Sequence, residues 1–295
     1  MSHFQEPENP ANFLGLPDSL ARREGAAGVL LPVPYERTVS YGGGAALGPR
    51  AILDASRYVE LYDHELGDEP CRRGIHTLPP LEVRGEALDA VVEEVAAAWS
   101  ELLAEPAFPV LLGGEHTVTV GAVRASAERF PGLSVLQLDA HADLRESYQG
   151  SPYSHACVMR RLADWVPGVG VGIRALSTDE ADFARRRGLR LIHGERLQAS
   201  DEWMDEALAA LTDIVYLTFD VDYFDPSLVP TTGTPEPGGG MWYPTLAFLR
   251  RVFAEKRVVA ADVVELAPRA DQPAGTYLTA KLVYKLFGYR FENAR

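Results

Sequence analysis

The clearest indication of the fold is LSVLQLDAHAD at residues 133–143, a short apolar run that ends in two aspartates and a histidine. Two other runs have the same form, FPVLLGGEH at 108–116 and IVYLTFDVD at 214–222. Each apolar part is continuous rather than alternating, which is typical of a strand buried on both faces of a parallel sheet. Because ligands bind beyond the carboxyl ends of such strands, the polar ends of the three runs predict one shared site.

Short runs rich in Val, Ile and Leu alternate with amphipathic stretches along most of the chain, which predicts a three-layer α/β/α fold with a mostly parallel central sheet. We expect strands at Gly28–Pro34, Phe108–Leu112, Leu133–Asp139, Gly168–Ile173, Leu189–Ile192, Ile214–Asp220 and Val258–Glu265. We expect helices over about 86–104, 117–130, 178–187, 202–211, 245–255 and 273–287. No linker, repeat or low-complexity tract divides the chain, so we predict one domain at 27–295 after a Pro-rich N-terminal arm at 1–26.

The composition excludes several classes of protein. The 295 residues carry 28 basic and 42 acidic side chains, a net charge of −14, which argues against nucleic acid and weakly favours a cationic ligand. No apolar run is long enough to span a membrane, and the polar, acidic start predicts a cytoplasmic protein. The two cysteines, Cys71 and Cys157, are too far apart in the sequence to suggest a cysteine-built metal site.

Six candidate metal ligands follow three of the expected strands: His116, Asp139, His141, Asp143, Asp220 and Asp222. Residues two apart in an extended segment point to the same side, so each motif can converge on one crevice. Any one motif alone could equally be a turn cap or a salt-bridged loop. Together, four carboxylates would repel one another without cations, so we infer a site for two divalent ions. Mixed oxygen and nitrogen ligands suit Mn, while Zn, Fe, Co and Ni stay open.

These residues resemble the ureohydrolase superfamily of arginases and agmatinases. The resemblance covers nearly all of the chain from about residue 27 and is carried by five motifs in the family order: 113–116, 139–143, 218–226, 233–239 and 262–268. It implies two Mn²⁺ ions per subunit, one held by His116, Asp139, Asp143 and Asp220 and the other by Asp139, His141, Asp220 and Asp222. Family members are commonly trimers or hexamers, which implies a homo-oligomer.

The resemblance also implies roles for three further residues. Glu265 matches the family's guanidinium-binding glutamate, and a carboxylate suits that planar cation because it accepts paired hydrogen bonds. His155 matches a mobile histidine that carries protons, for which an imidazole has a suitable pKa. Thr234 is expected to orient the substrate. Hydrolysis of a guanidinium needs a strong nucleophile, which two metal ions provide as a bridging hydroxide.

The substrate suggested by the sequence is agmatine, cleaved to urea and putrescine in polyamine biosynthesis. Arginases usually carry Asn at the position of Arg145, so the clamp for an α-amino acid is missing here. N1-aminopropylagmatine, guanidinobutyrate, formiminoglutamate and arginine remain alternatives, as does a non-catalytic metal-binding homologue.

Two departures from the family pattern carry their own expectations. Glu115 stands where the family often has Asp, and we expect it to hydrogen-bond close to the metal site. Gly238–Gly240 predicts an unusually free loop.

Overall fold

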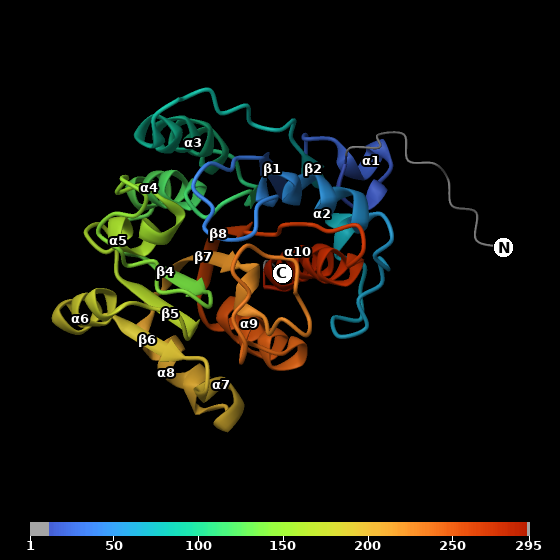
Figure 1. Cartoon of the computed structure of the whole chain (residues 1–295). Coiled ribbons are helices and arrows are strands. Elements are labelled where there is room, and N and C mark those ends of the chain that lie inside the picture. The colour runs from blue at the N-terminus through green and yellow to red at the C-terminus, as the bar shows by residue number, and fades with distance from the viewer. Residues whose placement is uncertain (1–11, 294–295) are drawn as a thin grey trace.

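The computed structural model describes residues 12–293, and the strands of this region form one parallel sheet in the order β2-β1-β3-β8-β7-β4-β5-β6 (Figure 1). The strands are β1 (Gly28–Val33), β2 (Ile75–Thr77), β3 (Phe108–Gly113), β4 (Leu133–Leu138), β5 (Gly168–Ile173), β6 (Arg190–His193), β7 (Ile214–Asp220) and β8 (Arg257–Val264). The α-helices are α1 (Asp18–Ala21), α2 (Gly48–Ser56), α3 (Leu88–Leu103), α4 (Val118–Arg129), α5 (Val158–Leu162), α6 (Thr178–Arg187), α7 (Arg196–Ala199), α8 (Glu202–Ala210), α9 (Trp242–Glu255) and α10 (Pro273–Glu292).

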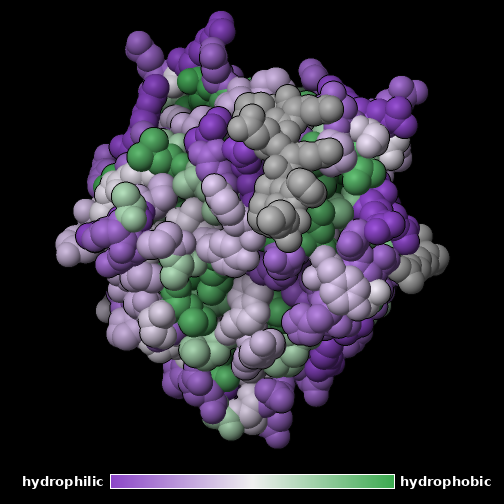
Figure 2. Space-filling model, turned by 90° about the vertical axis from the view of Figure 1, so that its right-hand side faces the viewer, coloured by the Kyte–Doolittle hydropathy of each residue, from purple (hydrophilic) through white to green (hydrophobic). Residues whose placement is uncertain are grey.

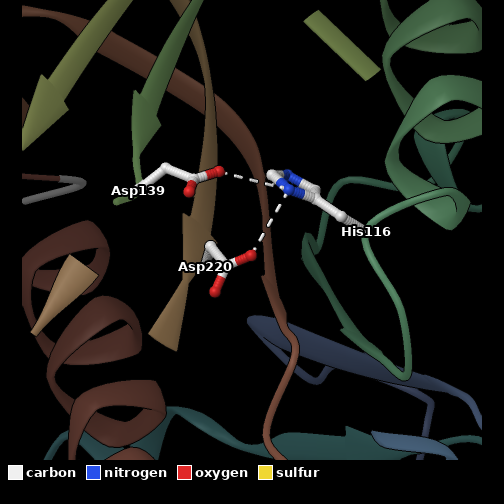
Figure 3. Close-up of side chains that lie close together, drawn as sticks. All are labelled: His116, Asp139 and Asp220. Atoms are coloured by element: carbon white, nitrogen blue, oxygen red, sulfur yellow. Dashed lines mark ion pairs between the residues drawn. The ribbon is translucent and has the colours of Figure 1, made fainter. Parts of the chain in front are cut away.

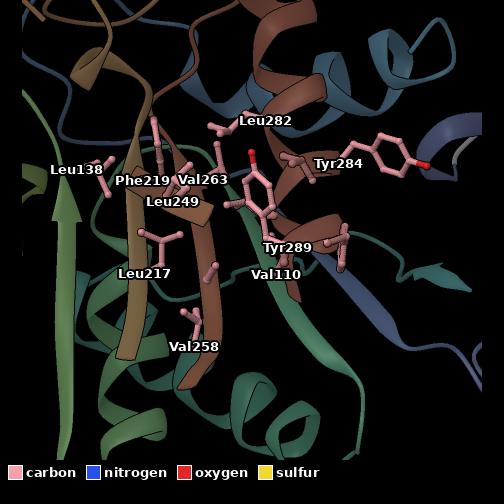
Figure 4. Packing of buried hydrophobic residues seen from close by; sticks show 14 of the residues in the cluster. Val110, Leu138, Leu217, Phe219, Leu249, Val258, Val263, Leu282, Tyr284 and Tyr289 are labelled. Carbon is pink, nitrogen blue, oxygen red and sulfur yellow. The ribbon is translucent and has the colours of Figure 1, made fainter. Parts of the chain in front are cut away.

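Helices cover both faces of the sheet, and each face has its own hydrophobic cluster. Side chains of α2, α8, α9 and α10 pack on one face, and those of α3, α4, α5 and α6 pack on the other. The strands supply both clusters because successive side chains point to opposite faces: Val215, Leu217 and Phe219 of β7 join the first cluster, whereas Tyr216 joins the second. Figure 4 shows side chains of the first cluster between the central strands and α10. The three-layer α/β/α prediction is therefore confirmed.

The observed strands agree with all seven expected ones to within one residue at either end. The strand β2 and the helices α1, α2, α5 and α7 were not predicted. The edge strand β2 has three residues, too few to show a pattern, and α2 begins at Gly48-Pro49, where the sequence reads as a turn. The last helix, α10, continues to Glu292, five residues beyond its expected end.

The expected N-terminal arm lies only partly within the described residues. Residues 12–26 contain a 3₁₀ turn, Phe13–Gly15, and α1. Phe13 and Leu16 are buried in the first hydrophobic cluster, so this part of the segment packs on the body of the protein. The remainder of the arm falls outside the described residues, and the domain boundary at residue 27 stays a prediction.

The lengths of the helices and the polarity of the surface can be compared with what a membrane crossing requires. Within residues 12–293, no helix combines the length and apolarity that a membrane crossing requires. Figure 2 shows one face on which hydrophobic residues occur in patches among hydrophilic ones. Large exposed side chains include Tyr41, Tyr58 and Tyr243.

Candidate metal and substrate site

All six candidate ligands lie at the carboxyl ends of three of the four central strands, β3, β7 and β4. The neighbouring strand β8 contributes Glu265 to the same edge, because β3, β8, β7 and β4 are consecutive in the sheet. A cavity of about 490 Å³ opens there and is lined by five of the six ligands, together with Glu265, His155 and Thr234. The topology therefore brings together residues that are up to 149 positions apart in the sequence.

His116 is the centre of the first group of possible ligands. Its Nδ1 lies 3.3 Å from an Asp139 oxygen, 3.0 Å from an Asp143 oxygen and 3.5 Å from an Asp220 oxygen. Figure 3 shows the carboxylates of Asp139 and Asp220 pointing at the His116 ring from neighbouring strands. All four side chains are buried, and within residues 12–293 this Nδ1 has no hydrogen-bond partner. The arrangement is that of ligands around a small cation.

The protonation of His116 is set from its other side. Its Nε2 is 2.9 Å from Thr218 Oγ1, and the Thr218 hydroxyl donates to Asp262 at 2.6 Å. Since the single Thr218 proton goes to the carboxylate, Thr218 accepts the Nε2–H of His116. Tyr216 and Thr119 also donate to Asp262, which anchors this acid in the sheet. Nδ1 therefore faces the carboxylates. Although burial opposes it, interaction with the carboxylates of Asp139 and Asp143 raises the pKa of His116 well above its usual value, so a metal ion bound here would take the place of an Nδ1 proton.

A second group consists of Asp139, His141 and Asp222. His141 Nδ1 is 2.8 Å from an Asp222 oxygen and 3.7 Å from an Asp139 oxygen. The Asp222 carboxylate also accepts the Ala140 N–H at 2.9 Å, and Gln137 donates to Asp139 at 2.8 Å. Because Asp139 belongs to both groups, the two possible ion positions are adjacent.

Within residues 12–293, no Lys or Arg pairs with the ligand aspartates, whose ion-pair partners are His116 and His141. Although burial opposes it, the charge of Asp222 raises the pKa of His141 to about 12. Burial raises the pKa of Asp220 well above its usual value, and repulsion by Asp222 and Asp139 adds to this effect. Burial and the Asp139 charge raise the pKa of Asp143 to about 7. Crowded, buried carboxylates and a buried imidazole lone pair fit divalent cations, which would relieve the repulsion and occupy the lone pair.

The backbone at the site takes conformations that few residues adopt. A Cβ on Gly114 would lie 2.0 Å from the Tyr35 carbonyl oxygen, so only glycine permits this approach just before His116. Asp143 and Glu265 both have positive φ, 52° and 65°. Such strain in non-glycine residues often marks functional sites, because surrounding contacts must hold it in place.

Glu265 follows β8 and points into the cavity. Its Oε1 accepts the backbone N–H of His116 at 2.6 Å, which ties it to the first ligand group. Burial raises its pKa to about 8. The other carboxylate oxygen has no hydrogen-bond partner among residues 12–293 and lies 3.9 Å from the position of a Cβ on Gly233. This oxygen can receive a cationic ligand in the cavity.

His155 and Thr234 line the same cavity on other loops. Burial lowers the pKa of His155 to about 4, so its ring is neutral at neutral pH. Its ring nitrogens contact Thr38 and Ser40 in the loop that follows β1. Thr234 is half-buried and follows Gly233, whose carbonyl accepts the Gly42 N–H at 2.9 Å.

Glu115 does not contact the ring of a metal-ligand residue. Its carboxylate accepts the N–H groups of Arg37 and Thr38, both at 2.6 Å, and the hydroxyls of Thr38 and Thr117. The expected hydrogen bonding near the site is present, and it is directed at the loop after β1.

The expectation of a free loop at Gly238–Gly240 is wrong. A Cβ on Gly239 would lie 2.5 Å from backbone atoms of residues 223–225, and one on Gly240 would lie 2.3 Å from the Tyr223 ring. These glycines allow close packing rather than freedom. The Gly240 N–H and carbonyl also pair with the backbone of Tyr223 and Asp225.

Several residues that shape the site had no assigned role in the sequence analysis. Asp262 could have been recognised from the sequence, because it is the one acidic residue between the ends of an apolar strand. Thr218 could have been recognised as well, since it lies two positions before Asp220 and so points to the same face. No pattern in the sequence pointed to Arg174 or to the loop residues Thr38 and Ser40. The guanidinium of Arg174 donates to the carbonyls of Asp222 and Glu236. The partners of all three residues are distant in the sequence.

Comparisons with known proteins agree with this geometry. The arginase family profile matches residues 26–288. The N(1)-aminopropylagmatine ureohydrolase of Synechocystis sp. is 42% identical over 92% of this chain and 91% of its own length. The agmatinase of Pyrococcus horikoshii is 32% identical over 88% and 90%. The structure of agmatine ureohydrolase from Thermoplasma volcanium has a TM-score of 0.84 at 31% identity and covers 92% of both chains. The chain therefore belongs to the arginase family and is a ureohydrolase, an enzyme that hydrolyses guanidino C–N bonds.

Proposed function

We propose that this ureohydrolase depends on two Mn²⁺ ions and acts on guanidino amines of the agmatine type, with N1-aminopropylagmatine preferred to agmatine. Hydrolysis releases urea and leaves spermidine from the longer substrate or putrescine from the shorter one, which assigns the enzyme to polyamine biosynthesis. The preference for the longer substrate is supported by the relatives of that name, which are up to 42% identical, against 32% for the agmatinase of Pyrococcus horikoshii.

The observation that carries the proposal is the set of ligand aspartates whose ion-pair partners within residues 12–293 are His116 and His141, with no Lys or Arg among them. We assign one ion to His116, Asp139, Asp143 and Asp220, and the other to Asp139, His141, Asp220 and Asp222. Bound divalent ions lower the pKa of water toward neutrality, which supplies the nucleophile. Neither cysteine belongs to a possible ligand group among the described residues, and the oxygen and nitrogen donors suit Mn.

The protein's own residues bind the substrate and move protons. The free oxygen of Glu265 accepts hydrogen bonds from the guanidinium and holds its carbon beside the metal ligands. Thr234 lies on the same wall of the cavity and orients the guanidinium. His155 is neutral, so it can take a proton in the cavity and give it to the departing amine.

The far end of the substrate has one free carboxylate available. Glu236 lines the cavity, and within residues 12–293 its side chain has no hydrogen bond or ion pair, although its carbonyl accepts from Arg174. Glu180, by contrast, accepts from Leu144 and Ser177 and is fully engaged. We assign Glu236 to the second ammonium of the longer substrate, which agmatine lacks.

The deciding experiment measures urea release by Mn-loaded protein from N1-aminopropylagmatine, agmatine, arginine and guanidinobutyrate, with metal content determined on the same sample. We expect two ions per chain and the highest kcat/KM on N1-aminopropylagmatine. Glu265→Gln should keep both ions and bind substrate poorly, while Glu101→Gln on the exposed face of α3 is the matched control. Two bound ions without urea from any substrate would refute the activity.

A further inference from the structure

The two ring nitrogens of His155 are held by one loop, although that loop is more than 110 residues away in the sequence. Thr38 Oγ1 lies 2.9 Å from Nδ1, and Ser40 Oγ lies 2.9 Å from Nε2. Both residues belong to the segment between β1 and α2. Thr38 is buried, whereas Ser40 lines the cavity. The Nδ1 side of the ring therefore faces the protein and the Nε2 side faces the cavity.

The proton count at Thr38 identifies which nitrogen of the ring carries hydrogen. A threonine hydroxyl has one proton to donate and two lone pairs to accept with. Its Oγ1 is 2.9 Å from a Glu115 oxygen, and an ionised carboxylate can only accept, so the proton goes to Glu115. One lone pair accepts the backbone N–H of His155 at 3.1 Å. The remaining lone pair can face Nδ1 favourably only when Nδ1 carries a hydrogen.

The Glu115 carboxylate also accepts hydrogen bonds, and it does so at both oxygens. Its Oε2 accepts two backbone N–H groups, those of Arg37 and Thr38, and its Oε1 accepts the hydroxyls of Thr38 and Thr117. With four donors around this fully buried carboxylate, both of its oxygens act as acceptors. The direction of the Thr38 hydrogen bond is thus determined by the protein.

We propose that Thr38, held by Glu115, is a positioning residue that keeps neutral His155 protonated on Nδ1, so that Nε2, which contacts Ser40 Oγ, is the nitrogen that exchanges a proton in the cavity. This inference rests on the proposed function, because it assigns the proton transfer to His155. Nε2 accepts the proton that the attacking water gives up as its oxygen bonds to the guanidinium carbon. The resulting Nε2–H then passes to the nitrogen of the departing amine as the bond between that nitrogen and the carbon breaks, which restores the neutral Nδ1–H ring. Ser40 and Tyr148, which meet at 3.2 Å, border the same side.

The charged and titratable groups around His155 come from three other segments. Tyr148 meets its ring edge-on with 5.7 Å between centroids, and Arg145 lies over Tyr148. His116, His141 and Asp139 act on it across the cavity. None of these groups hydrogen-bonds to Nδ1, whose partners among the described residues are Thr38 and, at 3.3 Å, Ser154. Thr38 is the closer one.

The first test is the tautomer itself, read by long-range ¹H–¹⁵N correlation NMR of ¹⁵N-histidine-labelled enzyme. The protein is loaded with diamagnetic Zn²⁺ and held at about pH 8, where the ring is neutral. The His155 signals are assigned by their loss in His155→Asn. We expect the Nδ1–H form in the unaltered protein and in Thr38→Ser, which keeps the hydroxyl. In Thr38→Val the Nδ1–H form should lose its dominance.

Glu115→Gln supplies a sharper test that keeps the Thr38 hydroxyl. The amide oxygen must face the two backbone N–H groups, so the amide NH₂ faces Thr38 and Thr117. Thr38 then accepts from the amide and turns its own proton to His155 Nδ1, which reverses the tautomer to Nε2–H. A purely structural role for Glu115 would not reverse it. Metal content is measured alongside, because residue 115 precedes a ligand.

Activity gives the second readout. In the Mn-loaded enzyme, Thr38→Val and Glu115→Gln should lower kcat about 10- to 100-fold with little change in KM, and Thr38→Ser should restore it. A dominant Nε2–H form in the unaltered protein, or an unchanged Nδ1–H form in both variants, overturns the positioning role. Urea release from the substrate panel tests the proposed function separately. An Nδ1–H ring in a protein that releases no urea would uphold Thr38 as the residue that sets the tautomer and refute the proton transfer.

Discussion

Two clusters of buried charge lie in different parts of this protein and are balanced in opposite ways. In the first, between α10 and the loop after α2, Lys285 Nζ is 2.8 Å from an Asp63 oxygen and 2.6 Å from a Glu65 oxygen. Tyr289 and Arg250 also donate to Glu65. In the second, at the ends of the central strands, the ion-pair partners of the ligand aspartates within residues 12–293 are His116 and His141, and no Lys or Arg pairs with them or with Glu265.

The pKa values of the buried acids differ between the two clusters. Although burial favours the neutral acid, hydrogen bonding and attraction to Lys285 lower the pKa of Asp63 below its usual value. Burial and neighbouring carboxylates instead raise the pKa of Asp220. The first cluster is complete within the chain, whereas the second needs cations from outside it. Substitutions in the first cluster should therefore change stability, and substitutions in the second should change metal binding and activity.

The largest effect is expected for Asp139→Asn, which alters the residue shared by both possible ion positions. Metal content should fall, and kcat/KM on the preferred substrate should drop about a thousandfold, because several kcal/mol of charge stabilisation are lost. Asp222→Ala should act in the same direction through one ion. Metal analysis and urea release measure both. Two retained ions with near-normal turnover would contradict the assignment of the ligands.

Lys285→Met should do the reverse, with a loss of stability but not of metal. Removing the ammonium leaves Asp63 buried without its cation, which costs about 3–5 kcal/mol in the free energy of unfolding. Denaturant unfolding measures this change. The exposed pair of Arg185 with Asp182 is the control, because Arg185→Met should cost about 0–1 kcal/mol. An equally small cost for Lys285→Met would mean that the first cluster is not a stabilising one.

The metal-free protein should become less stable as the pH rises. The folded-state pKa values of Asp143, about 7, and Glu265, about 8, lie above the usual values of 3.8 and 4.5. Their protonated forms therefore contribute stability that is fully present below about pH 4 and is lost as the pH rises through 7 to 8. The expected slope is about 1 kcal/mol per pH unit for each of the two groups. Thermal unfolding after chelation, between about pH 5 and 8, measures it, and added Mn²⁺ should remove the slope. If the unfolding temperature of the chelated protein did not change with pH, the raised pKa values of these two acids would be contradicted.

The smallest effect is expected for Glu236→Gln at the far end of the cavity. It should lower kcat/KM on N1-aminopropylagmatine about tenfold and on agmatine less than about threefold, since one partly exposed charge contact is worth about 1 kcal/mol. Both values come from the same urea assay. Equal losses on the two substrates would place Glu236 at the amine they share and remove its role in selecting the longer one.

Much of this organisation could be predicted from the sequence. Continuous apolar runs such as Val215–Phe219 identify buried parallel strands, and their polar ends identify the edge that carries the site. Gly113-Gly114 before His116 is a pattern that favours a close approach of the backbone, and Gly114 does approach Tyr35 in this way. The loop at Gly238–Gly240 was misjudged, because a glycine that gives freedom and a glycine that allows close packing look alike in a sequence.

The sequence alone determined the strand pattern, the identity and order of the acidic and histidine motifs, and the family, because these depend on local periodicity and spacing. Only the tertiary structure decided which groups meet. The order of the strands places Glu265 of β8 between the motifs of β3 and β7, and the loop after β1 places Thr38 on His155. The same is true of the pairing of Lys285 with Asp63, 222 residues away. Such contacts depend on how distant segments of the chain fold together. The protonation and charge of these groups depend on burial, which no local sequence pattern predicts.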